Sequence, residues 1–95
     1  MKKLFLLLSI YKMQIELRKS AVKDLNALPK AIKETIHLKM AELAHFPDVT
    51  HIKKLTNFEP AYRLRVGDYR ILFDVIGNEK IVIGRVLHRK ESYKK

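Results

Sequence analysis

The pattern of hydrophobic and polar residues divides the chain after residue 12 into segments with two different periods. In the segment 13–19, hydrophobic Met13, Ile15 and Leu17 alternate with polar neighbours. Alternation with a period of two is typical of a strand that buries one face. The sequence therefore predicts a half-buried strand at the start of this region.

Two helices are predicted to follow this strand. Ser20 can cap the first helix, and Pro29 ends it while suiting the first turn of the second. The second helix extends from Lys30 to about Ala44, because apolar residues recur there at spacings of three and four. The apolar residues are Ala21, Val22, Leu25 and Leu28 in the first helix and Ile32, Ile36, Met40 and Leu43 in the second. We expect the two helices to form a hairpin that lies on one face of a sheet.

The last third of the chain is rich in strand-forming residues and turns. Strands are predicted at 61–66, 69–76 and 81–87, joined by a two-residue turn at Gly67-Asp68 and a second turn over 77–80. Consecutive strands with short turns form an antiparallel meander. The predicted fold class is therefore α+β, with an N-terminal strand, a helical hairpin and a three-strand antiparallel meander.

The two-residue turn fixes how the first two strands of the meander pair. It places Arg65 opposite Arg70 and Tyr62 opposite Phe73, so that one face is apolar and the other is charged. The apolar face, expected under the helices, consists of Tyr62, Leu64, Val66, Tyr69, Ile71, Phe73 and Val75. The opposite face carries Arg63, Arg65, Arg70, Leu72 and Asp74.

The third strand is expected to add a fourth arginine to the charged face. If the second turn has an even number of residues, Val75 pairs with Val82 and Arg85 lies opposite Leu72. Like charges on neighbouring strands are destabilising, and Asp74 alone does not neutralise four arginines. We therefore expect an anion on this face, and phosphate fits best because guanidinium groups bind it bidentately. A solvated basic face without a ligand is the alternative.

Composition also indicates a polyanionic partner. The 95 residues include 20 basic and 10 acidic side chains, which gives a formal net charge of +10. Such an imbalance suits nucleic acid, an anionic membrane or an acidic protein, with solubility as the plain alternative. The absence of cysteine excludes disulfides and zinc-thiolate sites. No apolar run approaches the roughly 20 residues that span a bilayer.

The first twelve residues allow three interpretations. The stretch MKKLFLLLSI resembles the start of a secretory signal, although no small-residue cleavage site follows it. It could instead be an element packed on the domain. A third possibility is a mis-called extension with Met13 as the true start, leaving one domain over residues 13–95.

The tail HRKESYKK contains residue types suited to RNA cleavage. Histidine exchanges protons near neutral pH, arginine stabilises charge on a phosphate, and tyrosine stacks on bases or moves protons. The tail supplies these types in His88, Arg89 and Tyr93. These groups suffice for an RNase that uses the RNA's own 2′-hydroxyl as nucleophile, without a metal. An ordinary solvated tail is the alternative. The other histidines, His37, His45 and His51, lack metal-ligand spacing and are interpreted as structural or surface residues.

Several segments together resemble the RelE/ParE superfamily of toxins from bacterial type II toxin–antitoxin pairs, and most of all its RelE branch. These segments are SAVKDLNALP, KKL before the loop, YRLRVGDYRILFDV and HRKESY. The resemblance extends from about Met13 to Tyr93. It implies a cytoplasmic toxin, without cofactor or metal, that cleaves mRNA in the ribosomal decoding site.

The resemblance also implies partners and an alternative activity. An acidic antitoxin is expected to wrap the toxin, and the complex is expected to reach operator DNA through that antitoxin. Messenger RNA and ribosomal RNA are the expected nucleic-acid partners. ParE-type members share the fold but poison DNA gyrase and do not cut RNA, so a gyrase inhibitor is the main alternative. An inactive protein or a simple RNA binder is the third.

The resemblance assigns roles to individual residues of this chain. Arg70 matches the arginine of the family's GYR element, and Arg89 matches the tail arginine; both are expected to contact the reacting phosphate. Tyr93 matches the C-terminal tyrosine that stacks on the base or helps to move a proton. His88 matches the histidine that many members place before the tail arginine.

One departure from the family pattern changes the expected chemistry. Arg63 and Arg65 stand where the best-known member has lysines, and an arginine cannot serve as a general base. Proton transfer is therefore expected to shift towards His88. Unbroken alternation would turn His88 away from the face of Arg85, so a bulge or a strand end is expected between them. The residues expected to bind RNA are Arg63, Arg65, Arg85, Lys53 and Lys54.

Overall fold

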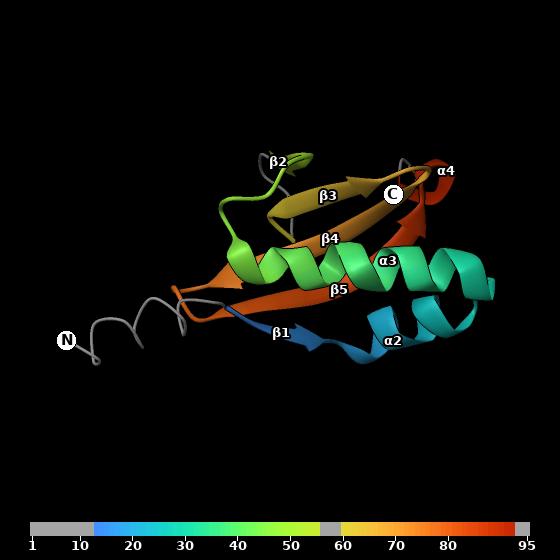
Figure 1. Cartoon of the computed structure of the whole chain (residues 1–95), viewed down its shortest axis with the longest axis horizontal. Coiled ribbons are helices and arrows are strands. Elements are labelled where there is room, and N and C mark those ends of the chain that lie inside the picture. Colours follow the sequence, from blue (N-terminus) through green and yellow to red (C-terminus); the bar gives the residue numbers. More distant parts are fainter. Residues whose placement is uncertain (1–12, 56–59, 93–95) are drawn as a thin grey trace.

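The computed structural model describes residues 13–55 and 60–92, and within them the chain forms a five-stranded sheet in the order β1-β5-β4-β3-β2 (Figure 1). The elements are β1 (Gln14–Leu17), α2 (Lys19–Asn26), α3 (Lys30–Glu42), the 3-10 helix η1 (Leu43–His45), β2 (Ile52–Lys54), β3 (Tyr62–Val66), β4 (Tyr69–Ile76), β5 (Lys80–His88) and α4 (Arg89–Ser92). Helices and an antiparallel meander occur in the expected order, so the predicted α+β class is confirmed. The first twelve residues lie outside the described part.

The N-terminal strand forms as the alternation predicts and occupies one edge of the sheet. β1 pairs with β5 in parallel, from Gln14 opposite Lys80 to Leu17 opposite Ile83. Met13 is buried and Ile15 is half-buried against the core, while their polar neighbours face solvent. The edge strand thus closes the sheet beside β5.

The helical hairpin forms, but two predictions for its first helix are wrong. α2 begins at Lys19, and its N-cap residue is Arg18, without a side-chain cap. Ser20 lies inside the first turn, where its hydroxyl donates to the carbonyl of Gly84 at 2.6 Å instead of capping the helix. Val22 is 43% exposed rather than buried. Both differences follow from the way α2 packs against β5, which selects Ala21 and Leu25 as its buried residues.

One strand, β2, was not predicted. Its three residues pair antiparallel with β3, from Ile52 opposite Leu64 to Lys54 opposite Tyr62. Three residues are too few to show alternation in the sequence, so the pattern of period two carries no signal there. The sheet therefore has one strand more at its β3 edge than the sequence predicts.

The register of β3 against β4 is confirmed in every predicted pair. Val66 lies opposite Tyr69 and Arg65 opposite Arg70 across the two-residue turn. Gly67 has φ 58°, a left-handed conformation at the first turn position where such hairpins favour glycine.

The register of β4 against β5 differs from the prediction near the second turn. Three residues, 77–79, separate Ile76 from its partner Lys80, so Val75 pairs with Ile81 and not with Val82. A shift between Leu72 and Phe73 then leaves Gly84 as the extra residue of a bulge. The bulge offsets the odd turn, and Arg85 lies opposite Leu72 as predicted.

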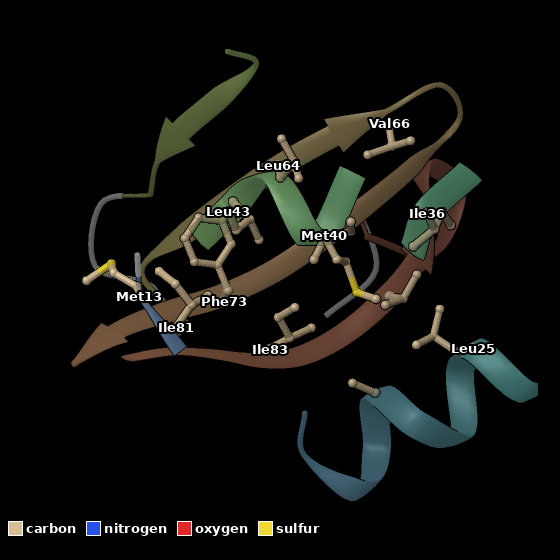
Figure 2. Close-up of a cluster of buried hydrophobic side chains, with 13 residues drawn as sticks. Met13, Leu25, Ile36, Met40, Leu43, Leu64, Val66, Phe73, Ile81 and Ile83 are labelled. Atoms are coloured by element: carbon tan, nitrogen blue, oxygen red, sulfur yellow. The ribbon is translucent and has the colours of Figure 1, made fainter. Parts of the chain in front are cut away.

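The core fills the space between the helices and one face of the sheet (Figure 2). Its fully buried large side chains are Ile36, Leu43, Ile71, Phe73, Ile81 and Ile83. Phe46 extends this core through edge contacts with Tyr62 and Phe73. Within the described residues, no helix is long and apolar enough to cross a membrane.

Candidate nucleic-acid interface

The sheet face turned away from the core, here called the outer face, carries a row of side chains from four strands. Lys53 pairs with Arg63, Arg63 with Leu72, and Leu72 with Arg85. In the next row, Arg65 pairs with Arg70. The two rows therefore contain two like-charge cross-strand pairs, which cost stability unless an anion neutralises them.

Three cations of the outer face form no ion pair with any described residue. In the part of the chain that the structure describes, no carboxylate lies within ion-pair distance of Lys53, Arg63 or Arg65. Lys53 and Arg65 are exposed, and Arg63 is half-buried. These side chains are open to a polyanion. Asp74 lies on the same face, but its carboxylate accepts a hydrogen bond from the backbone of Ala61 at 2.7 Å.

Arg70 is buried although it carries a permanent charge. Its residue is 6% exposed, and Nη1 donates to the carbonyl of Tyr69 at 3.2 Å and, weakly, to that of Gly67 at 3.5 Å. Its Nε is buried and has no hydrogen-bond partner among the described residues. A buried cation with only carbonyl acceptors is costly, and such groups are typical of functional sites.

Arg85 reaches the outer face at its predicted position but is already paired. Its Nε and Nη2 donate to the two carboxylate oxygens of Asp24 at 2.8 and 3.1 Å. The same carboxylate accepts the backbone N–H of Val86 at 2.9 Å. Asp24 therefore joins α2 to the edge of β5 beyond the end of β1. Sequence reasoning missed Asp24, because the two paired positions are 61 residues apart and share no local pattern.

Lys54 does not join Lys53 on the outer face. It lies opposite Tyr62 on the core-side face, and its Nζ is 6.0 Å from the centre of that ring. The structure therefore separates two lysines that sequence reasoning grouped together.

His88 also lies on the core-side face. It pairs with Tyr69, and the two rings meet edge to face with centroids 5.3 Å apart. The bulge at Gly84 comes before Arg85, so alternation from Arg85 to His88 is unbroken and the strand ends only at His88 itself. The expected interruption between these two residues is absent, and they face opposite sides of the sheet.

The tail begins in a fixed position next to the turn between β3 and β4 (Figure 1). The backbone N–H of Arg89 donates to the carbonyl of Asp68 at 2.6 Å. His88 Nδ1 accepts the backbone N–H of Lys90 at 3.2 Å, which caps α4. Because a backbone N–H can only donate, the neutral ring carries its proton on Nε2. Tyr93 lies outside the described residues.

The candidate site thus lies at one end of the sheet, where three segments meet. β3 supplies Arg65, β4 supplies Arg70, and the last residue of β5 and the first of α4 supply His88 and Arg89. Cations lie on the outer face and a histidine on the other face, so a ligand that contacts both sets must pass over this end of the sheet.

Comparison with known proteins shows which family this chain resembles. A family model described as the ParE toxin of type II toxin–antitoxin systems, parDE, matches residues 15–93. Toxin RelE3 of Methanocaldococcus jannaschii is 38% identical over 85 residues, which cover 85% of this chain and 96% of that protein.

Solved structures give the same result. The RelB-RelE antitoxin–toxin complex from Methanococcus jannaschii is similar at 36% identity with a TM-score of 0.68, covering 83% of this chain and 95% of that one. The archaeal RelE-RelB complex from Pyrococcus horikoshii is similar at 27% identity with a TM-score of 0.70, covering 82% and 96%.

These relatives correct one part of the expectation drawn from the sequence. They include archaeal proteins, so a restriction to bacterial systems has no support. The family match over nearly the whole described chain and the identity to curated RelE toxins agree with the observed fold. The chain therefore belongs to the RelE/ParE superfamily of type II toxin–antitoxin toxins, and it is RelE-like.

Proposed function

We propose that this toxin is an endoribonuclease that cleaves mRNA in the decoding site of the ribosome and thereby inhibits translation. The observation that carries the proposal is Arg70, a buried cation whose described hydrogen-bond acceptors are carbonyls only, opposite the exposed guanidinium of Arg65. A phosphate of RNA would neutralise the positive charges of these two arginines.

The proposed reaction uses the RNA's own 2′-hydroxyl and no metal. The 2′-oxygen loses its proton and attacks the adjacent phosphorus, and the bond from phosphorus to the 5′-oxygen breaks. The products are a 2′,3′-cyclic phosphate and a 5′-hydroxyl that has gained a proton. Arg70 and Arg89 stabilise the additional negative charge of the pentacoordinate phosphorus.

Proton transfer is assigned to His88 and Tyr93. In this tautomer the N–H of Nε2 would donate to the phosphate or to the leaving oxygen. Accepting a proton requires Nδ1, and the hydrogen bond from Lys90 then has to be released. We therefore infer that His88 acts as a base only when the first turn of α4 loosens.

Binding of the RNA backbone is assigned to the open cations of the outer face, Lys53, Arg63 and Arg65. Arg85 and Lys54 remain predicted RNA contacts with a weaker basis. Asp24 neutralises Arg85, and Lys54 lies on the core-side face.

The proposed protein partner is an acidic antitoxin. The similar structures from Methanococcus jannaschii and Pyrococcus horikoshii are complexes of RelE with RelB, and a net charge of +10 suits an acidic protein that wraps the toxin. We propose that the complex contacts operator DNA through the antitoxin.

Cleavage mapping on ribosomes tests this function. Purified toxin is added to ribosomes programmed with a defined mRNA, and the new 5′ ends are mapped with and without ribosomes. Cuts within the decoding site are expected for the native chain and none for Arg70→Ala. Lys39→Ala is the control, since it removes an exposed cation near the C-terminal end of α3, on the core side of the sheet, and it should cleave normally. Intact mRNA with the native chain overturns the proposal.

A gyrase inhibitor is the second candidate, because the matching family model is described as the ParE toxin. The native chain would then block supercoiling of plasmid DNA by purified gyrase while leaving mRNA intact. The supercoiling assay, run beside the cleavage assay with the same preparations, separates the two activities.

A further inference from the structure

The placement of Arg70 and His88 constrains the path of RNA. β4 and β5 turn these side chains to opposite faces of the sheet, and both lie at the same end of it. An RNA strand that contacts both has to bend over that end. One flank then runs along the outer face past Arg65, and the other flank arrives on the core-side face.

A cleft lies where the second flank arrives. It is formed between α2 with the residues after it and the end of the sheet, and its volume is about 460 Å³. One wall is formed by Lys23 of α2 and by Ala27 and Leu28 after it, and the wall from the sheet includes Tyr69, Val86 and His88. This volume is within the range of small-ligand sites in proteins.

The charge and surface of the cleft suit a nucleotide. Asp24 also lines it, but both carboxylate oxygens already accept hydrogen bonds from Arg85. Lys23 is exposed, and no carboxylate of the described residues lies within ion-pair distance of it. The cleft therefore has a net positive charge beside the edge-to-face rings of Tyr69 and His88.

We propose that this cleft is a subsite for one nucleotide next to the scissile bond. The base packs against Tyr69 and His88, and its phosphate pairs with Lys23. Aromatic rings bind bases of any sequence, so the subsite adds affinity and fixes the strand without reading one particular base. The inference rests on the proposed function.

The test measures binding without cleavage. The full chain is titrated with a 2′-O-methyl trinucleotide, which lacks the reacting hydroxyl, and backbone amide NMR shifts are recorded. Shifts at Lys23, Ala27 and His88 are expected in addition to those at Arg65. Lys23→Ala and Ala27→Trp are each expected to weaken binding roughly tenfold. The controls Lys33→Ala and Ala41→Trp, made on α3 away from the cleft, should bind like the native chain.

A second measurement assigns the site to the base. An abasic residue at the flanking position should weaken binding to the native chain but not to Ala27→Trp, which fills the cleft. If RNA changes amide shifts only on the outer face, the subsite is refuted but the proposed function is not. The subsite is also overturned if an acidic antitoxin peptide, but not RNA, changes the amide shifts of the cleft residues. Intact mRNA in the ribosome assay overturns the proposed function, and the subsite with it.

Discussion

Arg70 joins two properties that oppose each other in a folded protein, charge and burial. Its guanidinium is enclosed with carbonyl acceptors, and Nε has no hydrogen-bond partner among the described residues. Replacing a buried charged group by an apolar one of similar length is often neutral or stabilising. We predict that Arg70→Met leaves the free energy of unfolding unchanged or raises it, while RNA cleavage is abolished.

Urea unfolding and the ribosome assay check this prediction together. Leu72→Ala serves as the stability control, because Leu72 is a neighbouring buried apolar residue, and this variant should be destabilised by about 2–4 kcal/mol. If Arg70→Met is destabilised as much as Leu72→Ala, Arg70 stabilises the fold and its burial is no evidence of a functional role.

His88 allows proton transfer to be separated from helix capping. Glutamine has an amide oxygen that can accept the N–H of Lys90 in place of Nδ1, but it cannot take up a proton. We predict that His88→Gln slows cleavage more than Arg63→Lys, which keeps its positive charge. Single-turnover rates on ribosome-bound mRNA provide the comparison, and equal effects would place the general base on another residue.

At the scale of elements, side chains of α2 bond the backbone groups of β5 that lie beyond the end of β1. β1 pairs only as far as Ile83, after which Ser20 bonds to Gly84 and Asp24 to Val86. Side chains of a helix thus continue the edge of the sheet up to the residues that begin the tail. The end of β5 would otherwise present open backbone groups beside the candidate site.

This connection predicts a specific decrease in stability. Asp24→Ala removes the acceptor of two Arg85 hydrogen bonds and of the Val86 N–H, and it should cost roughly 1–3 kcal/mol. Asp24→Asn keeps one acceptor oxygen, so its free energy of unfolding should lie between those of Asp24→Ala and the native chain. Chemical denaturation measures both, with Glu34→Ala on the exposed side of α3 as the control within about 0.5 kcal/mol of the native chain. Equal stability of Asp24→Ala would refute the connection.

The sequence predicts an element well where its hydrophobic periodicity extends over many residues. It predicts less well where a turn or a bulge sets the pairing of two strands. The eight residues of β4 and the stripe of α3 were predicted within a residue or two, because alternation or helical spacing persists through them. β2, with three residues, shows no period. The pair of Leu72 and Arg85 was predicted correctly from a wrong turn length, since the odd turn and the bulge at Gly84 cancel.

The site shows the same division. The shared face of Arg63, Arg65 and Arg70 follows from one two-residue turn, so it was predictable. The pairing of Asp24 with Arg85 depends on how α2 packs on β5, which no local spacing encodes.

At the scale of the whole molecule, the excess charge of +10 can act as a general field or through a few specific ion pairs with phosphate. Salt separates these two cases, because each phosphate that a cation neutralises releases counterions. For a single strand, the slope of log K against log salt changes by about 0.7 for each such ion pair removed. We place the ion pairs on the outer face, at Arg63 and Arg65, and regard a lysine such as Lys33 on α3 as part of the field.

This assignment gives the last prediction. For a 2′-O-methyl RNA, Arg63→Ala and Arg65→Ala should each reduce the salt slope by about 0.7, and the double variant by about twice that. Lys33→Ala removes the same formal charge and should leave the slope unchanged. Binding isotherms at several salt concentrations provide the slopes. If all three single variants lower the slope equally, the RNA is held by the overall charge and the outer face is not its binding site.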